Sequence, residues 1–142
     1  MILIDANVLL YAYNSSFDQH ATARAWLEQA VAGPEPVGLA WLTILAFMRI
    51  ATNARAFEFP LTTDEATAIV SEWLEHPNID VVSETPYHWA TLSGLLNEHR
   101  LRGPAMMDAH LAALALDHGA TLCTTDRDFR RFEKLRVLNP LA

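Results

Sequence analysis

Short apolar runs alternate along this chain with longer stretches in which apolar residues recur every three or four positions. The short runs predict β-strands and the periodic stretches predict α-helices. The predicted strands cover residues 2–5, 36–41, 79–83, 121–126 and 136–140. Because strands alternate with helices, we expect an α/β fold: a three-layer α/β/α sandwich around a central parallel sheet of four to five strands, with right-handed crossovers.

The periodic stretches also carry signals for where helices begin and end. Helices are predicted at residues 9–14, 18–31, 42–53, 61–76, 86–101 and 105–119, with a short helical piece at 127–132. Asn7 is expected near the cap of the first helix. Thr63 is expected at the N-cap of the fourth, which then has Ala66 at its third position in place of a capping-box glutamate. Pro86 is expected in the first turn of the fifth helix. Gly119 is expected at the C′ position of the last, which is apolar on most sides and therefore predicted to be buried against the sheet.

The chain has 142 residues, of which 51% are hydrophobic, so residues 1–142 are expected to form a single domain around one core. No apolar run approaches the roughly 18–20 residues of a membrane-spanning helix, and no basic segment precedes the first strand. We therefore expect a soluble, cytoplasmic protein that does not contact membranes. Cys123, the single cysteine, lies in an apolar run and is expected to be a buried thiol, which leaves no disulfide framework.

The formal net charge of −7 is unfavourable for binding nucleic acid, because phosphate contacts normally come from an excess of lysine and arginine. The distribution of the basic residues softens this objection, since seven of the ten fall in the last third of the chain. These seven are Arg100, Arg102, Arg127, Arg130, Arg131, Lys134 and Arg136. A solvated charged face and a phosphate-binding track are both consistent with this pattern.

Three aspartates far apart in the sequence are the candidate functional residues. Asp5 and Asp126 follow the first and fourth predicted strands, and ligands of open parallel sheets bind beyond the carboxyl ends of the strands. Asp108 lies near the start of the apolar helix, on the face that Leu111 and Ala115 turn toward the core, where an unpaired carboxylate is costly. Taken singly, each strand-end aspartate could be a turn or helix cap, and Asp108 could simply interact with the helix dipole.

Three carboxylates in one pocket would repel one another, and a hard divalent cation with oxygen ligands relieves that repulsion. Mg²⁺ or Mn²⁺ suits such a site and predicts hydrolysis of a phosphodiester. Zinc does not fit, because one cysteine and six histidines without paired spacing offer no zinc-ligand pattern. His110 is interpreted as a structural or surface residue. Asn7, Thr124 and Thr125 are candidates to hold ligand carboxylates or waters, although each is also an ordinary cap or turn residue.

With these residues in view, the chain resembles a PIN domain, and specifically a VapC-type toxin of a bacterial toxin–antitoxin pair. The resemblance spans nearly the whole chain and rests on four segments in the right order: ILIDANVLLYA, WLTILAFMRIATN, MDAHLAALALDHGATL and TTDRDF. It implies a parallel sheet between helices and Mg²⁺- or Mn²⁺-dependent cleavage of structured RNA, often tRNA or rRNA. It also implies a VapB-type antitoxin as the protein partner, which blocks the acidic site.

The resemblance also implies roles for individual residues. The catalytic, metal-binding positions of the family carry over onto Asp5, Asp108 and Asp126. Supporting or substrate-contacting positions carry over onto Asn7, Arg49, Thr124 and Asp128.

One position departs from the family pattern. The middle segment of many members has a glutamate where this chain has Ala46, which shares a helix face with Arg49 and Asn53. No carboxylate therefore comes from this helix, and one metal ion or two both remain compatible with the site. Two functions follow: an active endoribonuclease toxin or, as the alternative, a catalytically weak PIN domain that acts as an RNA- or antitoxin-binding module.

A third hypothesis, a phosphotransfer domain of the phosphatase or response-receiver type, also places an aspartate after the first strand. The phosphatase pattern needs a second aspartate where this chain has Asn7, and both types need a lysine near the site. The only lysine, Lys134, falls in the C-terminal tail, so this hypothesis ranks last.

The four tryptophans are Trp26, Trp41, Trp73 and Trp89. Each taken singly is expected in the core. Together with a mean hydropathy of +0.11, they indicate that another chain covers some apolar surface. The resemblance implies a homodimer in complex with the antitoxin.

Overall fold

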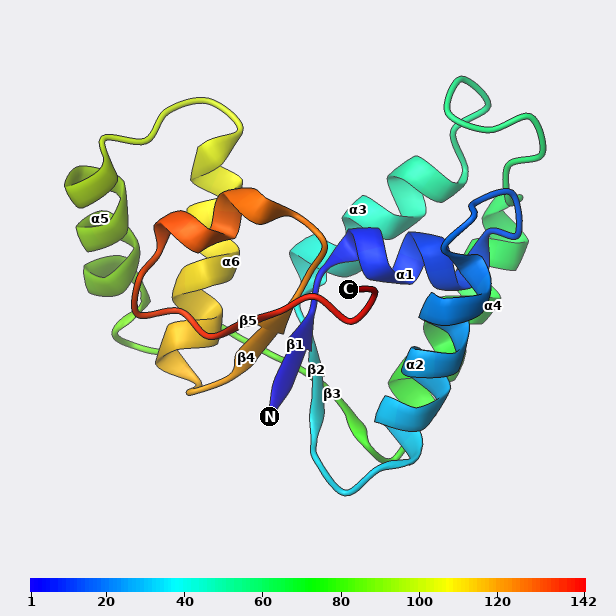
Figure 1. Cartoon of the computed structure of the whole chain (residues 1–142), viewed down its shortest axis with the longest axis horizontal. Coiled ribbons are helices and arrows are strands. Elements are labelled where there is room, and N and C mark those ends of the chain that lie inside the picture. Colours follow the sequence, from blue (N-terminus) through cyan, green and yellow to red (C-terminus); the bar gives the residue numbers. More distant parts are fainter.

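One five-stranded sheet forms the centre of the molecule in a computed structural model that describes all residues from Met1 to Ala142 (Figure 1). Every pair of neighbouring strands is parallel. The strands are β1 (Ile2–Ile4), β2 (Val37–Leu39), β3 (Ile79–Val81), β4 (Thr121–Cys123) and β5 (Val137–Leu138). Their order across the sheet is β3-β2-β1-β4-β5, so the first strand of the chain lies in the middle. The predicted parallel sheet is confirmed.

Helices cover both faces of this sheet. They are α1 (Ala6–Tyr13), α2 (His20–Ala32), α3 (Trp41–Ala51), α4 (Thr63–Glu75), α5 (His88–His99), α6 (Ala105–Asp117) and the 3-10 helix η1 (Arg127–Arg131). In Figure 1, α1 to α4 lie on one side of the sheet, and α5, α6 and η1 lie on the other. The three-layer prediction is therefore confirmed.

The alternation of side chains along β1 divides the core into two parts. Ile2 and Ile4 pack with buried residues of α1 to α4, whereas Leu3 packs with buried residues of α6 and η1. The first part includes an aromatic contact in which the Trp73 indole donates a hydrogen bond of 2.9 Å to the Tyr13 hydroxyl. Both parts of the core meet at β1. Asp5, the residue that follows this strand, therefore lies where the two parts of the core join.

The predicted cap was close for the first helix and wrong by one residue for the fourth. The N-cap of α1 is Asp5, two residues before Asn7, and its carboxylate accepts a hydrogen bond of 2.8 Å from the Ala6 amide. The N-cap of α4 is Thr62 rather than Thr63, and Thr62 and Glu65 form a complete capping box. This box satisfies two amide groups that a helix end leaves unpaired, which explains why α4 begins at Thr63, one residue earlier than a cap at Thr63 would place it.

The other two predicted signals had different outcomes. Pro86 lies in the turn before α5, and not in its first turn, because Thr85 accepts a hydrogen bond from the Tyr87 amide there and the helix begins at His88. Gly119 has φ of +63° directly after the C-cap of α6, which is the left-handed conformation expected for glycine at C′. The prediction of a buried α6 is confirmed by a run of buried residues from Leu111 to Ala115.

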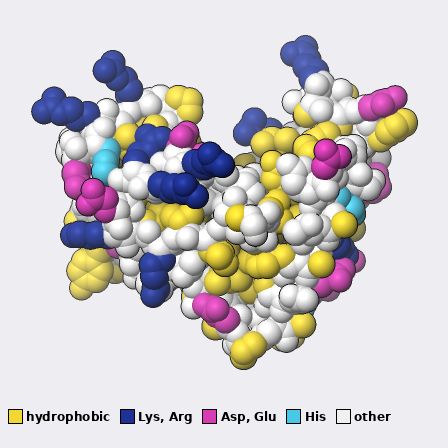
Figure 2. Space-filling model, viewed as in Figure 1, with side chains coloured by type: hydrophobic (Ala, Val, Ile, Leu, Met, Phe, Trp, Pro, Cys, Tyr) yellow, Lys and Arg dark blue, Asp and Glu magenta, His cyan; other side chains and the backbone are white.

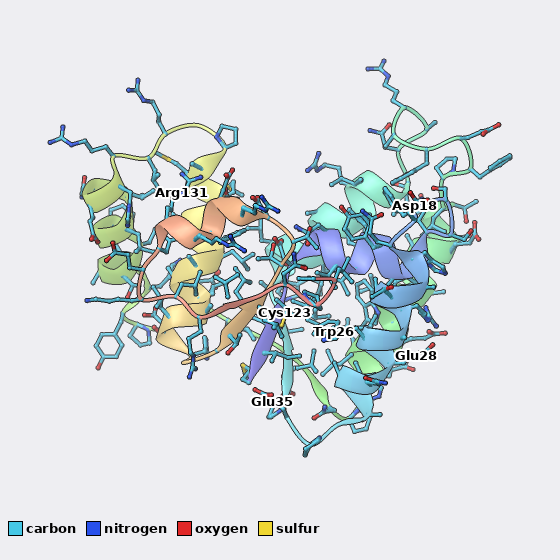
Figure 3. The ribbon with its side chains drawn as sticks, viewed as in Figure 1. Asp18, Trp26, Glu28, Glu35, Cys123 and Arg131 are labelled. Atoms are coloured by element: carbon cyan, nitrogen blue, oxygen red, sulfur yellow. The ribbon has the colours of Figure 1, made fainter.

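The expectation that all four tryptophans belong to the core was wrong for two of them. Trp73 is buried and Trp26 is half-buried, but the exposed fractions of Trp41 and Trp89 are 52% and 70%. Cys123 is fully buried, as predicted, and burial raises the pKa of its thiol to about 12. Figure 3 shows Cys123 in the middle of the molecule, on the central sheet.

His110 links two helices. Its Nδ1 atom lies 2.9 Å from Nε2 of His88, so the two rings connect α6 to α5, and its Nε2 atom lies 3.5 Å from a carboxylate oxygen of Glu84. Burial lowers the pKa of His110, and the neighbouring His88 ring lowers it further. This position agrees with the structural interpretation of His110.

No helix of the protein has the length and apolar character needed to cross a bilayer.

Candidate metal centre

Asp5 lies at the junction between β1 and α1, at the carboxyl end of the central strand. Its carboxylate accepts hydrogen bonds from the Ala6 amide (2.8 Å), from the Thr124 hydroxyl (2.7 Å) and from the Asn7 side-chain amide (3.3 Å). The aspartate therefore has two roles, because it caps α1 and projects a carboxylate beyond the end of the sheet.

Thr124, which follows β4, joins both ends of the chain at this point. Its hydroxyl donates to Asp5 and accepts from the Asn7 side chain (3.1 Å) and from the Asp126 amide (3.0 Å). The Thr125 amide completes the contact by donating to the Asn7 side-chain oxygen (3.3 Å). A hydroxyl can donate one hydrogen bond and accept two, so these three bonds use its full capacity. Thr124 is only 1% exposed, so these bonds are shielded from water.

A second group of carboxylates lies beside Asp5. Ligand oxygens of Asp108, on the first turn of α6, and of Asp126 and Asp128, around the start of η1, all lie within 4.8 Å of one another. Asp126 is the N-cap of η1 and accepts a hydrogen bond of 2.9 Å from the Asp128 amide. This turn brings Asp128 alongside Asp126. Asp108 and Asp126 are half-buried, whereas Asp128 is exposed.

The carboxylates influence one another electrostatically. Burial is the largest effect that raises the pKa of Asp5; hydrogen bonds from Thr124 and Ala6 oppose it, and the charge of Asp126 adds to it. Burial also raises the pKa of Asp108, and the charges of Asp126 and Asp5 raise it further. The nearby Arg131 guanidinium opposes these effects on Asp108. Four acidic side chains therefore share one region of negative potential.

An all-oxygen set of this kind matches the ligands that Mg²⁺ and Mn²⁺ prefer. The mutual repulsion that raises the pKa of Asp108 is the kind of strain that a bound divalent cation removes. The residues present therefore fit the predicted ion. Which of the four carboxylates bind it directly stays a prediction.

The structure brings together most of the predicted site residues. Asp5, Asn7, Thr124, Thr125 and Asp126 are connected by hydrogen bonds, and Asp108 and Asp128 join them through the carboxylate group. Arg49 lies in the last turn of α3 with an exposed side chain that forms no ion pair. No carboxylate comes from α3, where Ala46 is half-buried.

Sequence reasoning did not single out Arg131 as a residue of this site. Its guanidinium lies 3.6 Å from the Asp128 carboxylate, and its side chain donates a hydrogen bond of 2.8 Å to the Asp128 carbonyl. Figure 3 shows Arg131 on η1, in the half of the molecule that contains α5 and α6. The only feature of the sequence that could have indicated this contact is that Arg131 follows Asp128 by three residues, a spacing that brings side chains together on a helix.

The sequence pattern of the PIN domain matches residues 2–135. Ribonuclease VapC37 of Mycobacterium tuberculosis is 40% identical over 142 residues, which cover 100% of this chain and 99% of the relative. Ribonuclease VapC33 of the same species is 39% identical over 141 residues, 99% of each chain. The chain therefore belongs to the PIN-domain family and, within it, to the VapC ribonucleases.

Solved structures share the same fold. VapBC-1 from nontypeable Haemophilus influenzae has a TM-score of 0.70 at 15% identity, covering 100% of both chains. M. tuberculosis VapC20, a toxin that cleaves the sarcin–ricin loop, has a TM-score of 0.69 at 17% identity and covers 93% of this chain and 95% of its own. VapBC2 of Rickettsia felis, bound to promoter DNA, has a TM-score of 0.68 at 18% identity and 98% coverage of both chains. At these identities the likeness concerns the fold alone.

Proposed function

We propose that this protein is a Mg²⁺- or Mn²⁺-dependent endoribonuclease toxin that hydrolyses a phosphodiester of structured RNA. The observation that carries the proposal is the convergence of four aspartates at the carboxyl edge of the sheet in a chain that belongs to the VapC ribonucleases. Neither fact alone is sufficient. Acidic clusters occur without metal, and family membership does not guarantee that an individual site is intact.

Asp5, Asp108 and Asp126 are the residues that would hold the ion, with Asp128 beside them. A divalent cation bound there supplies activation of a water and neutralisation of charge on the scissile phosphate. Asn7 and Thr124 keep the Asp5 carboxylate oriented through their hydrogen bonds. Arg131 balances part of the negative charge at Asp128.

The substrate class and the partner follow from the relatives. VapC20 is a toxin that cleaves the sarcin–ricin loop, which supports structured RNA, of ribosomal or transfer type, as the substrate of this protein. Several solved structures with this fold are VapBC complexes, which supports a VapB-type antitoxin that covers the acidic site. We further propose a homodimer, because Trp41 and Leu45 expose apolar surface one helical turn apart on α3.

Cleavage of ribosomal and transfer RNA by purified, antitoxin-free protein tests this proposal. We expect cleavage with Mg²⁺ or Mn²⁺ and none with a chelator. Asp5→Asn and Asp108→Asn should each reduce the rate by about 100-fold or more, the scale of removing one electrostatic contact to a transition state. Asp18→Asn is the matched control, because Asp18 is exposed and lies at the far side of the molecule from η1 (Figure 3). Equal cleavage by all variants would contradict the proposal.

The alternative function, an RNA- or antitoxin-binding module, is favoured by one observation: α3 contributes no carboxylate. The variant Ala46→Glu separates the two functions. If the parent cuts RNA, the variant should change the rate modestly and alter how many cations bind, as calorimetry would report. If the parent protein does not cleave RNA and Ala46→Glu cleaves it strongly, the natural chain is a binding module.

A further inference from the structure

Helix α5 has an outer face that is exposed to solvent. None of its residues is fully buried, and it packs mainly against α6. Its outer face and the loop to α6 line an open groove of about 830 Å³. The groove is formed by Trp89, Asn97 and Arg100 along α5, by Arg102 in the loop, and by Met106 at the start of α6.

The side chains of this groove combine a flat aromatic surface with free positive charge. Trp89 is 70% exposed and stacks on no other ring of the protein. Arg100 and Arg102 are exposed, and neither guanidinium forms an ion pair or a hydrogen bond. Nucleic-acid-binding proteins use this combination for single strands, with bases stacked on aromatic rings and phosphates beside arginines.

Arg100 also occupies an unfavourable backbone conformation. It ends α5 with φ of 51° and ψ of 47°, the left-handed region that favours glycine and disfavours a residue with a Cβ. Glycine at this position would relax the helix end, yet the chain carries an arginine. Arg100 therefore keeps a long, exposed side chain at a position where the backbone favours glycine.

The groove and the candidate metal centre share helix α6. Met106 lines the groove and precedes Asp108 by two residues on α6. On the other side, Asp126 lines a smaller hollow of about 250 Å³ together with Arg127 and Arg130. Arginines therefore line both the groove and the hollow beside Asp126. Figure 2 shows Lys and Arg side chains gathered over the half of the molecule that contains α5, α6 and η1.

We propose that Trp89, Arg100 and Arg102 form a binding site for an unpaired nucleotide segment of the RNA substrate, with a base stacked on Trp89 and phosphates beside the two arginines. This inference rests on the proposed function and extends it, because it places RNA recognition outside the carboxylate group. Unpaired loops are the parts of folded RNA whose bases can reach an aromatic side chain.

Charge favours RNA over a protein as the occupant. The protein has a formal net charge of −7, so a second copy of the chain would bring further negative charge on average. Two unpaired arginines that line the same groove as a tryptophan complement a polyanion instead. Glu98, the acidic residue nearest in sequence to this end of α5, lines a different hollow with Lys134 and Phe132 and leaves the groove free of carboxylates.

The test measures binding of a fluorescein-labelled, unstructured RNA in the Asp5→Asn background with Mg²⁺ present, so that cleavage does not interfere. Trp89→Ala should weaken binding by about 5- to 100-fold, as loss of one stacked base does, and Trp89→Phe should restore it to within about threefold. Arg100→Gln and Arg102→Gln should each lower the slope of log affinity against log salt by about 0.7.

Two control variants remove the same kinds of side chain at positions outside the groove. Phe59→Ala removes another exposed aromatic ring, and Arg55→Gln removes another exposed, unpaired arginine, both in the loop before α4. Both should leave RNA affinity unchanged. If Phe59→Ala weakens RNA binding as much as Trp89→Ala, the groove has no special role and the proposal is overturned.

Oligomeric state and kinetics separate the remaining outcomes. If Trp89→Ala leaves RNA affinity unchanged but lowers the mass in light scattering or antitoxin binding, the groove is a protein interface and the proposal is wrong. If the parent cuts RNA, Trp89→Ala should raise KM with little change in kcat. If the parent protein does not cleave RNA, and Trp89→Ala lowers the RNA affinity, the proposed cleavage is wrong but the proposed binding site is supported.

Discussion

The two sides of the candidate metal centre are held in different ways. On the β1 side, the Asp5 carboxylate accepts three hydrogen bonds and is largely enclosed by the core. On the α6 side, Asp108 accepts no hydrogen bond in the structure and is oriented only by its helix, and Asp128 is exposed beside Arg131. The same type of side chain is therefore fixed at one position and adaptable at the other.

This difference shows which part of the centre the fold builds before any cation arrives. Asp5 cannot rotate without breaking bonds to buried partners, so its position is set by folding. Asp108 and Asp128 can adjust to an ion or a phosphate. A centre of this kind combines a fixed reference point with ligands that adapt, and mutations on the two sides should have different consequences.

The largest effect is expected for Thr124→Val, which keeps the shape of the side chain and removes its hydroxyl. The Asp5 carboxylate, the Asn7 amide and the Asp126 amide would each lose a hydrogen bond. Removing a group that orients a metal ligand costs about 10- to 100-fold in metal affinity or activity. RNA cleavage and a Mg²⁺ titration measure both quantities, and thermal unfolding should also show a lower Tm, because buried polar groups are left unpaired.

The chain offers a matched control for this variant. Thr43 is also almost fully buried, at 2% exposed, but its hydroxyl has no hydrogen-bond partner. Thr43→Val removes an unpaired buried hydroxyl and should leave the Tm unchanged or raise it. If Thr43→Val and Thr124→Val had the same effect on cleavage, the hydrogen bonds of Thr124 would not be what fixes Asp5.

A smaller effect of opposite sign is expected for Asp108→Asn in the absence of metal. The pKa of Asp108 is raised above 3.8, so ionisation of this group destabilises the folded, metal-free protein. The wild type therefore loses stability relative to the variant as the pH rises from 3.8 through the raised pKa, and the difference stays constant above it. Solvent screens this half-exposed charge, so we expect a gain of about 2 °C in Tm at neutral pH.

Addition of Mg²⁺ should reverse the order of these two proteins. The wild type gains stability from an ion that binds only the folded state, whereas Asp108→Asn gains less because it lacks a ligand. Calorimetric melting at pH 4 and pH 7, with and without Mg²⁺, checks both statements. A variant less stable than the wild type without metal would mean that Asp108 is held by favourable contacts.

The smallest effect is expected for Asp128→Asn. Asp128 is exposed and partly neutralised by Arg131 at 3.6 Å, and exposed ion pairs contribute about 0–1 kcal/mol. Affinity for Mn²⁺, measured by calorimetry, should therefore fall by about fivefold or less. A loss as large as that of Asp5→Asn would place Asp128 among the principal ligands.

Much of the fold could be predicted from the sequence because its signals are local. Apolar runs and helical periodicity indicate the parallel sheet, the positions of the strands, and the buried helix that ends just before Gly119. The N-cap at Thr62 was missed because two adjacent threonines compete for it, and only the reciprocal bond with Glu65 decides between them.

The candidate site was predictable where it depends on strand ends and less so where it depends on tertiary packing. Asp5 and Asp126 follow from their positions after β1 and β4. The place of Asp128 depends on η1, whose geometry is fixed by burial of Phe129 and by the bond from the Asp128 amide to Asp126. The exposure of Trp89 could not be predicted, because α5 has a core-facing partner on one side only, and sequence periodicity did not show which face that is.

The position of β1 between β2 and β4 has a consequence for the synthesis of this protein. Asp5 and Asn7 are translated before the rest of the candidate site, and their partner Thr124 is separated from them by 119 and 117 residues. A nascent or truncated chain that ends before β4 contains Asp5 without Thr124, Asp126 or Asp128. Translation products that stop before β4 therefore lack most of the candidate site, and the site is complete only once the chain has been translated through Asp128.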